Sequence, residues 1–144
     1  MGKSVRDVMT PTVETASPSQ PLSEAAQTMK ISDIGSLPVV EEGRLVGMLT
    51  DRDIVVRAVA EGVDVNTVQV GDVASREPVT TAPEEDLDDA LALMARHRVR
   101  RLPVVEDGTL VGVLAQADVA LEAKEKNAGE MLRQISQPTS AERE

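Results

Sequence analysis

Apolar residues recur at helical spacing in two parts of the chain. In both parts they stand at positions i, i+3, i+4 and i+7: Leu22, Ala25, Ala26 and Met29 in the first, and Leu87, Ala90, Leu91 and Met94 in the second. Pro21 suits the first turn of a helix, and the acidic run at residues 84–86 suits the positive N-terminal end of the other. The pattern predicts one amphipathic helix in each half of the chain.

Short runs of leucine and β-branched residues follow each of these helices. Residues 37–40 and 45–49 flank a turn that contains Gly43, and residues 102–105 and 110–114 flank Gly108, which predicts two hairpins. The remaining predicted elements are strands at 12–15 and 79–81, second helices at 51–61 and 116–126, and lead-in turns or short helices at 5–9 and 70–74. Each half is therefore predicted to be β-α-β-β-α.

The two halves are copies of one unit. Ten of the 13 residues in 37–49 recur at 102–114, an offset of 65 residues, and the same offset relates Val5, Asp7, Leu22, Met29 and Asp53 to identical residues. Each copy has an apolar face to bury, so we expect the copies to pack about a pseudo-twofold axis. The predicted class is α/β (α+β), with repeats at 5–61 and 70–126, a connector at 62–69 and a polar, partly disordered tail at 127–144.

The composition of the chain excludes several classes of function. The 144-residue chain has a formal charge of −10, no Phe, Tyr, Trp or Cys, and one His. Nucleic acid is not an expected partner, because the charge repels phosphate backbones and no aromatic ring is available for base stacking. No metal centre is expected, and the chain offers no catalytic nucleophile with a neighbouring base, so we do not expect an enzyme. No apolar run reaches the roughly 18 residues of a membrane span, and a cytoplasmic location is expected.

The order of motifs resembles the CBS family, and the tandem resembles a stand-alone CBS pair. The order in the first copy is Asp7-Val8-Met9, a Thr-Val segment, an amphipathic helix, Leu-Pro-Val-Val, a glycine turn and Gly47-Met48-Leu49-Thr50-Asp51-Arg52-Asp53. The resemblance implies a regulatory module that binds AMP, ADP, ATP or a related adenosyl ligand between its repeats, with no tightly bound cofactor. It also implies a homodimer that signals to an effector protein, which the sequence does not identify.

The resemblance matches Thr50 and Asp53 to ligand-contacting residues. Chemically, a hydroxyl suits phosphate and a carboxylate accepts from ribose hydroxyls. The alternative is that Thr50 only caps a helix and Asp53 is only a favourable charge in its first turn. The second copy keeps Asp118 but has Ala115 in place of the threonine, so we expect that half-site to be weaker or empty.

The second copy has a cluster of basic residues at 97–101, whereas the equivalent residues 32–36 of the first copy include no basic residue. The resemblance implies that Arg100 and Arg101 reach phosphate, for which the guanidinium fork is suited. Arg96, His97 and Arg98 are instead expected to cap a helix C-terminus. We therefore expect one competent cleft that combines Asp53 and Thr50 with the arginines. The candidate walls for adenine are Thr12, Val13, Pro78, Val79 and Pro38 or Pro103.

A second hypothesis stays open, in which the pair is an interaction module that binds no nucleotide. For either hypothesis the second helices are expected to present uncovered apolar residues: Ile54, Val55 and Ala58 in the first copy, and Val119, Ala120 and Ala123 in the second. Such faces indicate a closed twofold homodimer.

Overall fold

The computed structural model describes residues 2–122 and shows two equivalent halves. In chain order these are α1 (Val5–Val8), α2 (Leu22–Ser32), β1 (Ser36–Glu41), β2 (Arg44–Thr50), α3 (Asp51–Ile54), the π-helix η1 (Val55–Val59), α4 (Val70–Val73), β3 (Ser75–Arg76), α5 (Leu87–His97), β4 (Arg101–Glu106) and β5 (Thr109–Ala115). Residues 116–122 are also helical. The bounds of α4, α5, β4 and β5 follow those of α1, α2, β1 and β2 by the predicted 65 residues. The fold is the expected α+β class.

Helices α2 and α5 bury the apolar stripe that the spacing predicts. Leu22, Ala25 and Met29 are buried on α2, and Leu87, Ala90 and Met94 are buried on α5. The carboxylate of Asp86 accepts from the backbone N–H of Asp88 and caps the start of α5. Arg98 ends α5 in the left-handed conformation, as Asp33 ends α2.

Each predicted hairpin has a turn of two residues. Glu42 and Gly43 have φ values of 53° and 81°, and Asp107 and Gly108 have 54° and 83°. Two successive residues with positive φ are typical of the turns that match the twist of antiparallel strands. The two hairpins form one sheet in the order β1-β2-β5-β4, joined where Arg44 pairs with Thr109 near the turns.

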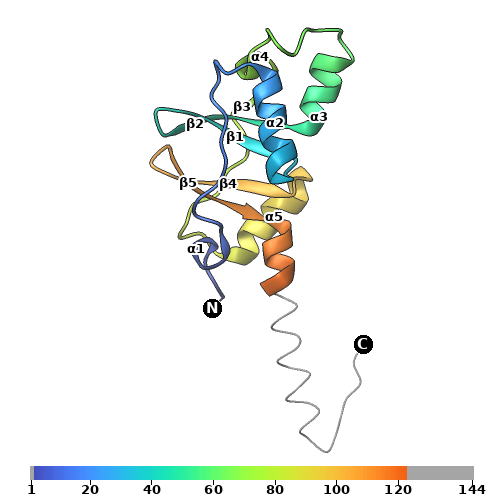
Figure 1. Ribbon diagram of the computed structural model, residues 1–144. Coiled ribbons are helices and arrows are strands. Elements are labelled where there is room, and N and C mark those ends of the chain that lie inside the picture. Colours follow the sequence, from blue (N-terminus) through green and yellow to red (C-terminus); the bar gives the residue numbers. More distant parts are fainter. Residues whose placement is uncertain (1, 123–144) are drawn as a thin grey trace, which may run out of the picture.

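The first short helix of each sequence repeat packs on the other repeat. Val5 of α1 is fully buried in the cluster formed by α5, β4 and β5, whereas Val70 and Val73 of α4 are buried in the cluster formed by α2, β1 and β2. Figure 1 shows this exchange, with α1 in the half that contains α5 and α4 beside α2. The chain leaving α1 therefore crosses between the repeats, where the backbone N–H of Thr10 donates to the carbonyl of Val113 at 2.9 Å.

The predicted strands at 12–15 and 79–81 are wrong. Only isolated parallel bridges form there, between Ala16 and Val39 and between Thr81 and Val104. The strand pairing occurs earlier, where β3 lies against β2 of the other repeat. Gly47 permits it, because a Cβ at this position would lie 2.7 Å from the carbonyl oxygen of Ser75.

The predicted uncovered helix face also needs correction. Ile54, Ala58 and Val119 pack into the cores of their own repeats. Val55 is exposed as predicted, and the other exposed apolar residues of these helical segments are Val56 and Val59 on η1 and Leu121. Ala120 is exposed as expected, while Ala123 and the predicted tail at 127–144 lie outside the described residues. Within residues 2–122, no helix combines the length and the apolar composition needed to cross a membrane.

Candidate functional site

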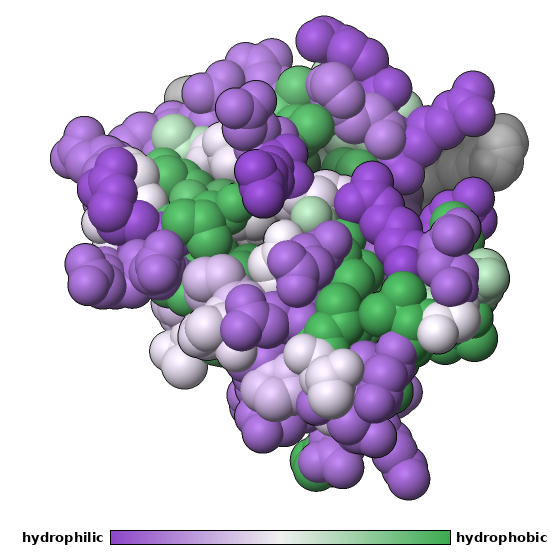
Figure 2. All heavy atoms as spheres, turned by 90° about the horizontal axis from the view of Figure 1, so that it is seen from above, coloured by the Kyte–Doolittle hydropathy of each residue, from purple (hydrophilic) through white to green (hydrophobic). Residues whose placement is uncertain are grey.

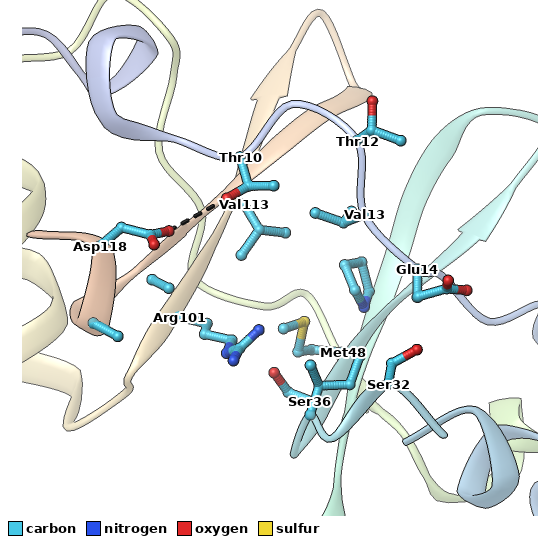
Figure 3. A pocket seen from close by; sticks show the side chains of 14 residues that line it. Thr10, Thr12, Val13, Glu14, Ser32, Ser36, Met48, Arg101, Val113 and Asp118 are labelled. Carbon is cyan, nitrogen blue, oxygen red and sulfur yellow. Dashed lines mark hydrogen bonds between the residues drawn. The ribbon is translucent and has the colours of Figure 1, made fainter. Parts of the chain in front are cut away.

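A cavity of about 310 Å³ lies between the two repeats (Figure 3). This volume is at the lower end of the range of about 300–1,000 Å³ typical of small-molecule sites. Its walls come from the segment after α1, from the first repeat and from the second hairpin: Thr10, Thr12, Val13, Glu14, Ser32, Ile34, Ser36, Pro38, Met48, Arg101, Val113, Ala115, Ala117 and Asp118. Both repeats are therefore needed to form it.

The carboxylate of Asp118 faces this cavity from the first turn of the helical segment 116–122. Its Oδ2 accepts a hydrogen bond from the Thr10 hydroxyl at 3.3 Å, which Figure 3 shows as a dashed line. Thr10 is held there by its backbone bridge to Val113. Gly112 allows this approach, because a Cβ on it would lie 2.7 Å from the Thr10 carbonyl oxygen. The exchanged N-terminal segment thus helps to position the carboxylate.

Arg101 supplies the positive charge of the cavity. This half-buried residue opens β4, and its guanidinium points toward Met48 and Ser36 of the other repeat (Figure 3). The Ser36 hydroxyl is buried and has no hydrogen-bond partner among the described residues. Arg101 and Asp118 offer donors and an acceptor at different places on the wall.

The rest of the wall is mixed, because Thr10, Thr12, Glu14, Ser32 and Ser36 are polar and the other lining residues are apolar. Val13, Ile34, Pro38, Met48 and Val113 line the cavity between the polar residues. An apolar slot with a few convergent polar groups is the usual character of a site for a flat organic ligand. A heterocyclic base fits this chemistry, with a hydroxyl-bearing sugar near the carboxylate and an anionic group near the guanidinium.

A second, larger cavity of about 830 Å³ adjoins the first and shares Ser36, Met48, Arg101, Ala115 and Ala117 with it. Its other lining residues are Gly35, Thr50, Asp51, Arg52, Arg98, Val99, Arg100, Gln116 and Ala120. Thr50 and Arg100, both predicted ligand contacts, therefore lie on the larger cavity.

Thr50 and Asp53 form a reciprocal capping box at the start of α3. The Thr50 hydroxyl accepts from the backbone N–H of Asp53 at 3.0 Å, and the Asp53 Oδ2 accepts from the backbone N–H of Thr50 at 3.0 Å. The helix-capping role that was the alternative interpretation of Thr50 and Asp53 is therefore observed. Ala115 has no hydroxyl, so this box cannot form in the second repeat, and the bond of Asp118 goes to Thr10.

The structure does not place Asp53 on the same inter-repeat cavity as Arg100 or Arg101, so the predicted grouping of these three residues differs from the observed one. Asp53 lines neither inter-repeat cavity, and Arg101 shares its cavity with Asp118. The hairpin register gives the reason: Arg101 pairs with Ala115, three residues before Asp118. By the same register, Ser36 pairs with Thr50, so Asp53 lies at the end of the other hairpin.

The predicted adenine walls divide into two groups. Thr12, Val13 and Pro38 line the smaller cavity, whereas Pro78, Val79 and Pro103 line neither. Pro103 is fully buried, and Val79 packs against the core of the second repeat. Several residues that line the smaller cavity were not predicted as ligand contacts: Thr10, Ile34, Ser36, Met48 and Val113.

This geometry, two equivalent halves around shared inter-repeat cavities, defines a tandem-repeat module. The CBS domain family model matches the chain twice, at residues 5–59 and 70–125, and the chain belongs to the CBS domain family. It is 48% identical over 134 residues to the CBS domain-containing protein YhcV of Bacillus subtilis, covering 92% of this chain and 95% of that protein. It is 37% identical over 134 residues to Hypoxic response protein 1 of Mycobacterium tuberculosis, covering 92% and 94%.

Solved structures show the same fold. The crystal structure of Hypoxic Response Protein I with two coordinated zinc ions has a TM-score of 0.77 and 38% identity, covering 83% of this chain and 98% of that one. CBSX2, a CBS-pair protein of Arabidopsis thaliana, was crystallised in complex with AMP; that structure has a TM-score of 0.78 and 28% identity, covering 88% and 99%. In residues 2–122 of the present chain, no group of three or more His, Asp or Glu side chains is placed to hold a metal ion.

Proposed function

We propose that this CBS pair is a regulatory module that binds an adenine nucleotide in the 310 Å³ cavity between its repeats. The observation that carries the proposal is the convergence of Asp118 and Arg101 on one cavity whose wall also contains the apolar residues Val13, Pro38 and Met48. The module acts by binding rather than by catalysis, and its signal passes to an effector protein.

The adenine ring lies in the apolar slot between Val13 and Pro38, in this proposal. The ribose hydroxyls donate to the Asp118 carboxylate, and the first phosphate accepts from Arg101. The AMP complex of CBSX2 supports this ligand class, since that chain has the same fold. The site uses the repeat whose motif lacks the threonine, which reverses the assignment expected from sequence.

Isothermal titration calorimetry of wild type and two matched variants tests the proposal. Asp118→Asn removes a charged acceptor from the cavity and should weaken AMP binding about 10- to 100-fold, the equivalent of about 1.5–3 kcal/mol for a charge-assisted hydrogen bond. Asp53→Asn is the control, because it makes the same chemical change at the equivalent position of the first repeat. A greater loss with Asp53→Asn, or no binding by wild type at millimolar AMP, ADP and ATP, would contradict the proposal. The second result would favour the interaction module instead.

We also propose that the protein is a homodimer that pairs through α3–η1. Val55, Val56 and Val59 are 57%, 44% and 61% exposed, and Figure 2 shows hydrophobic atoms at the surface among hydrophilic ones. Apolar groups gathered on one element favour association. Sedimentation velocity with interference optics should show a dimer at micromolar concentration, and Val59→Glu should shift it toward monomer. A monomeric wild type would contradict this assembly.

A further inference from the structure

A further cavity, of about 400 Å³, lies on the second repeat alone, where residues 80–85, α5 and β4 meet. It shares no lining residue with the two inter-repeat cavities, so the proposed nucleotide site does not use it. We call it the α5–β4 cavity. Its lining residues are Thr80, Thr81, Ala82, Glu85, Asp89, Ala90, Leu93 and Val105.

Glu85 and Asp89 give the α5–β4 cavity two exposed carboxylates. Among residues 2–122, the acidic partners of the ion pairs are Glu84 and Glu122, and the neighbouring carboxylate that accepts a backbone N–H is that of Asp86. Glu85 and Asp89 therefore have no donor in that part of the chain. Two carboxylates on one cavity repel each other, and a bound cation would replace this repulsion by attraction.

Thr81 contributes a buried polar group to the same wall. The residue is 8% exposed, and its Oγ1 has no hydrogen-bond partner among the described residues. The backbone on either side is fixed to β4, because the Thr81 N–H donates to the Pro103 carbonyl at 3.0 Å and the Thr81 carbonyl accepts from the Val105 N–H at 2.9 Å. A buried hydroxyl without a partner lowers stability and needs an explanation. Since Thr81 lines the cavity, a ligand there can supply the partner.

The first repeat differs at the equivalent positions, where it needs no external donor. By the 65-residue offset, the residues that replace Thr81, Glu85 and Asp89 are Ala16, Gln20 and Glu24. The side-chain amide of Gln20 donates to the Glu24 carboxylate at 3.4 Å, and Ala16 has no hydroxyl to satisfy. The second repeat thus exchanges an internal donor for a second carboxylate and adds a buried hydroxyl.

Apolar residues complete the α5–β4 cavity. Leu93 stands where the first repeat has Thr28, and it is four residues after Asp89 on α5, so the two side chains lie on the same helix face. Val105 lines the cavity from β4. An alkylammonium group matches this combination, because its head has three N–H donors and its stem packs on apolar surface. A metal ion would not use the apolar part, and within residues 2–122 no group of three or more acidic or histidine side chains is placed to hold one.

We propose that the α5–β4 cavity binds a primary alkylammonium group, carried by a free aliphatic amine or by a lysine side chain of a partner protein. The ammonium group donates to the carboxylates of Glu85 and Asp89, and the Thr81 hydroxyl is its third acceptor. The aliphatic stem lies on Leu93 and Val105. This site is separate from the proposed nucleotide site and does not depend on it.

Two-dimensional amide NMR spectra, recorded during titration with cadaverine and with a blocked lysine dipeptide, test the proposal. Low ionic strength is needed because salt screens exposed charges. Saturable shifts are expected at the amides of residues 80–93, and n-pentanol, which has the stem without the charge, should cause none. Tighter binding of the dipeptide would identify a protein partner as the source of the group, and tighter binding of cadaverine would identify a free amine.

Three variants make the test specific. Glu85→Gln recreates the glutamine–carboxylate pair of the first repeat and should weaken binding at least about 10-fold, the effect of one charge-assisted contact. Glu24→Gln is the matched control on the first repeat and should bind as wild type does. Thr81→Val keeps the shape of the side chain, so it should weaken binding without lowering the urea midpoint of unfolding.

Several results would overturn the proposal. These are the absence of saturable shifts with both amines, equal shifts with n-pentanol, and unchanged binding by Glu85→Gln. Displacement of cadaverine by Mg²⁺ or Ca²⁺ at equal concentration would show a cation site without selectivity for an alkylammonium group. A lower urea midpoint for Thr81→Val would show that its hydroxyl already stabilises the fold and is not reserved for a ligand.

Discussion

Because α1 packs on the other repeat, we predict that Val5 of the first sequence repeat stabilises the second repeat. Val5 has no exposed surface and packs in the cluster that contains Leu87, Leu102 and Leu114. Val5→Ala removes the equivalent of two methylene groups, about 0.8 kcal/mol each, and leaves a cavity that adds to the loss. We expect the free energy of unfolding to fall by about 2–3 kcal/mol.

Urea unfolding monitored by far-ultraviolet circular dichroism measures this change, because the chain has no Trp, Tyr or Phe to report by fluorescence. With an m-value of about 2 kcal/mol per molar, the midpoint should fall by about 1 M or somewhat more. Val46→Ala is the control, since Val46 is 40% exposed on β2, and its cost should stay within about 0.5 kcal/mol. Equal midpoints for Val5→Ala and Val46→Ala would refute the docking of α1 on the second repeat.

Three further predictions follow from local contacts. Thr50→Ala removes one half of the capping box and should lower the stability measured by thermal unfolding by about 1 kcal/mol, most of which Thr50→Ser should restore. An unchanged melting temperature for the alanine variant would contradict the capping role. Gly112→Ala places a Cβ against the Thr10 carbonyl, so it should lower both stability and nucleotide affinity; wild-type affinity in this variant would show that Thr10 does not position the site. The backbone N–H of Ser4 donates to the Asp7 carboxylate and lowers the pKa of that carboxyl group. The bond therefore stabilises the folded state at neutral pH, and this stabilisation is lost as the pH falls below the ordinary aspartate pKa toward the lowered one. Asp7→Asn should therefore flatten the acid side of the stability profile, and an unchanged profile would count against that bond.

The regular elements could be predicted because each depends on local pattern. Helical spacing located α2 and α5, and glycine turns located both hairpins. The exchange of α1 and α4 could not be found this way, because the 65-residue offset is the same whichever repeat each short helix packs on. The predicted strands at 12–15 and 79–81 were wrong for a related reason, since the crossing segments pair with the opposite repeat before those residues are reached.

The two inter-repeat cavities group the predicted site residues differently from the sequence-based expectation, and the ligand contacts of these residues stay a prediction. From sequence, Asp53 was grouped with Arg101 because a carboxylate for ribose and a guanidinium for phosphate complement each other. A two-residue turn at 107–108, however, places the start of β4 beside the end of β5, so Arg101 pairs with Ala115 close to Asp118. That register is available from the sequence once the turn length is known. Thr10 and Met48 depend on the crossing segment and the partner hairpin, and no local signal marks them.

The most direct test of the account is a crystal structure of the protein with AMP at saturating concentration. We expect one AMP in the smaller inter-repeat cavity, with the adenine between Val13 and Pro38, the ribose hydroxyls on the Asp118 carboxylate and the phosphate at Arg101. An AMP whose ribose lies on Asp53, or a smaller cavity that stays empty at saturation, would contradict it.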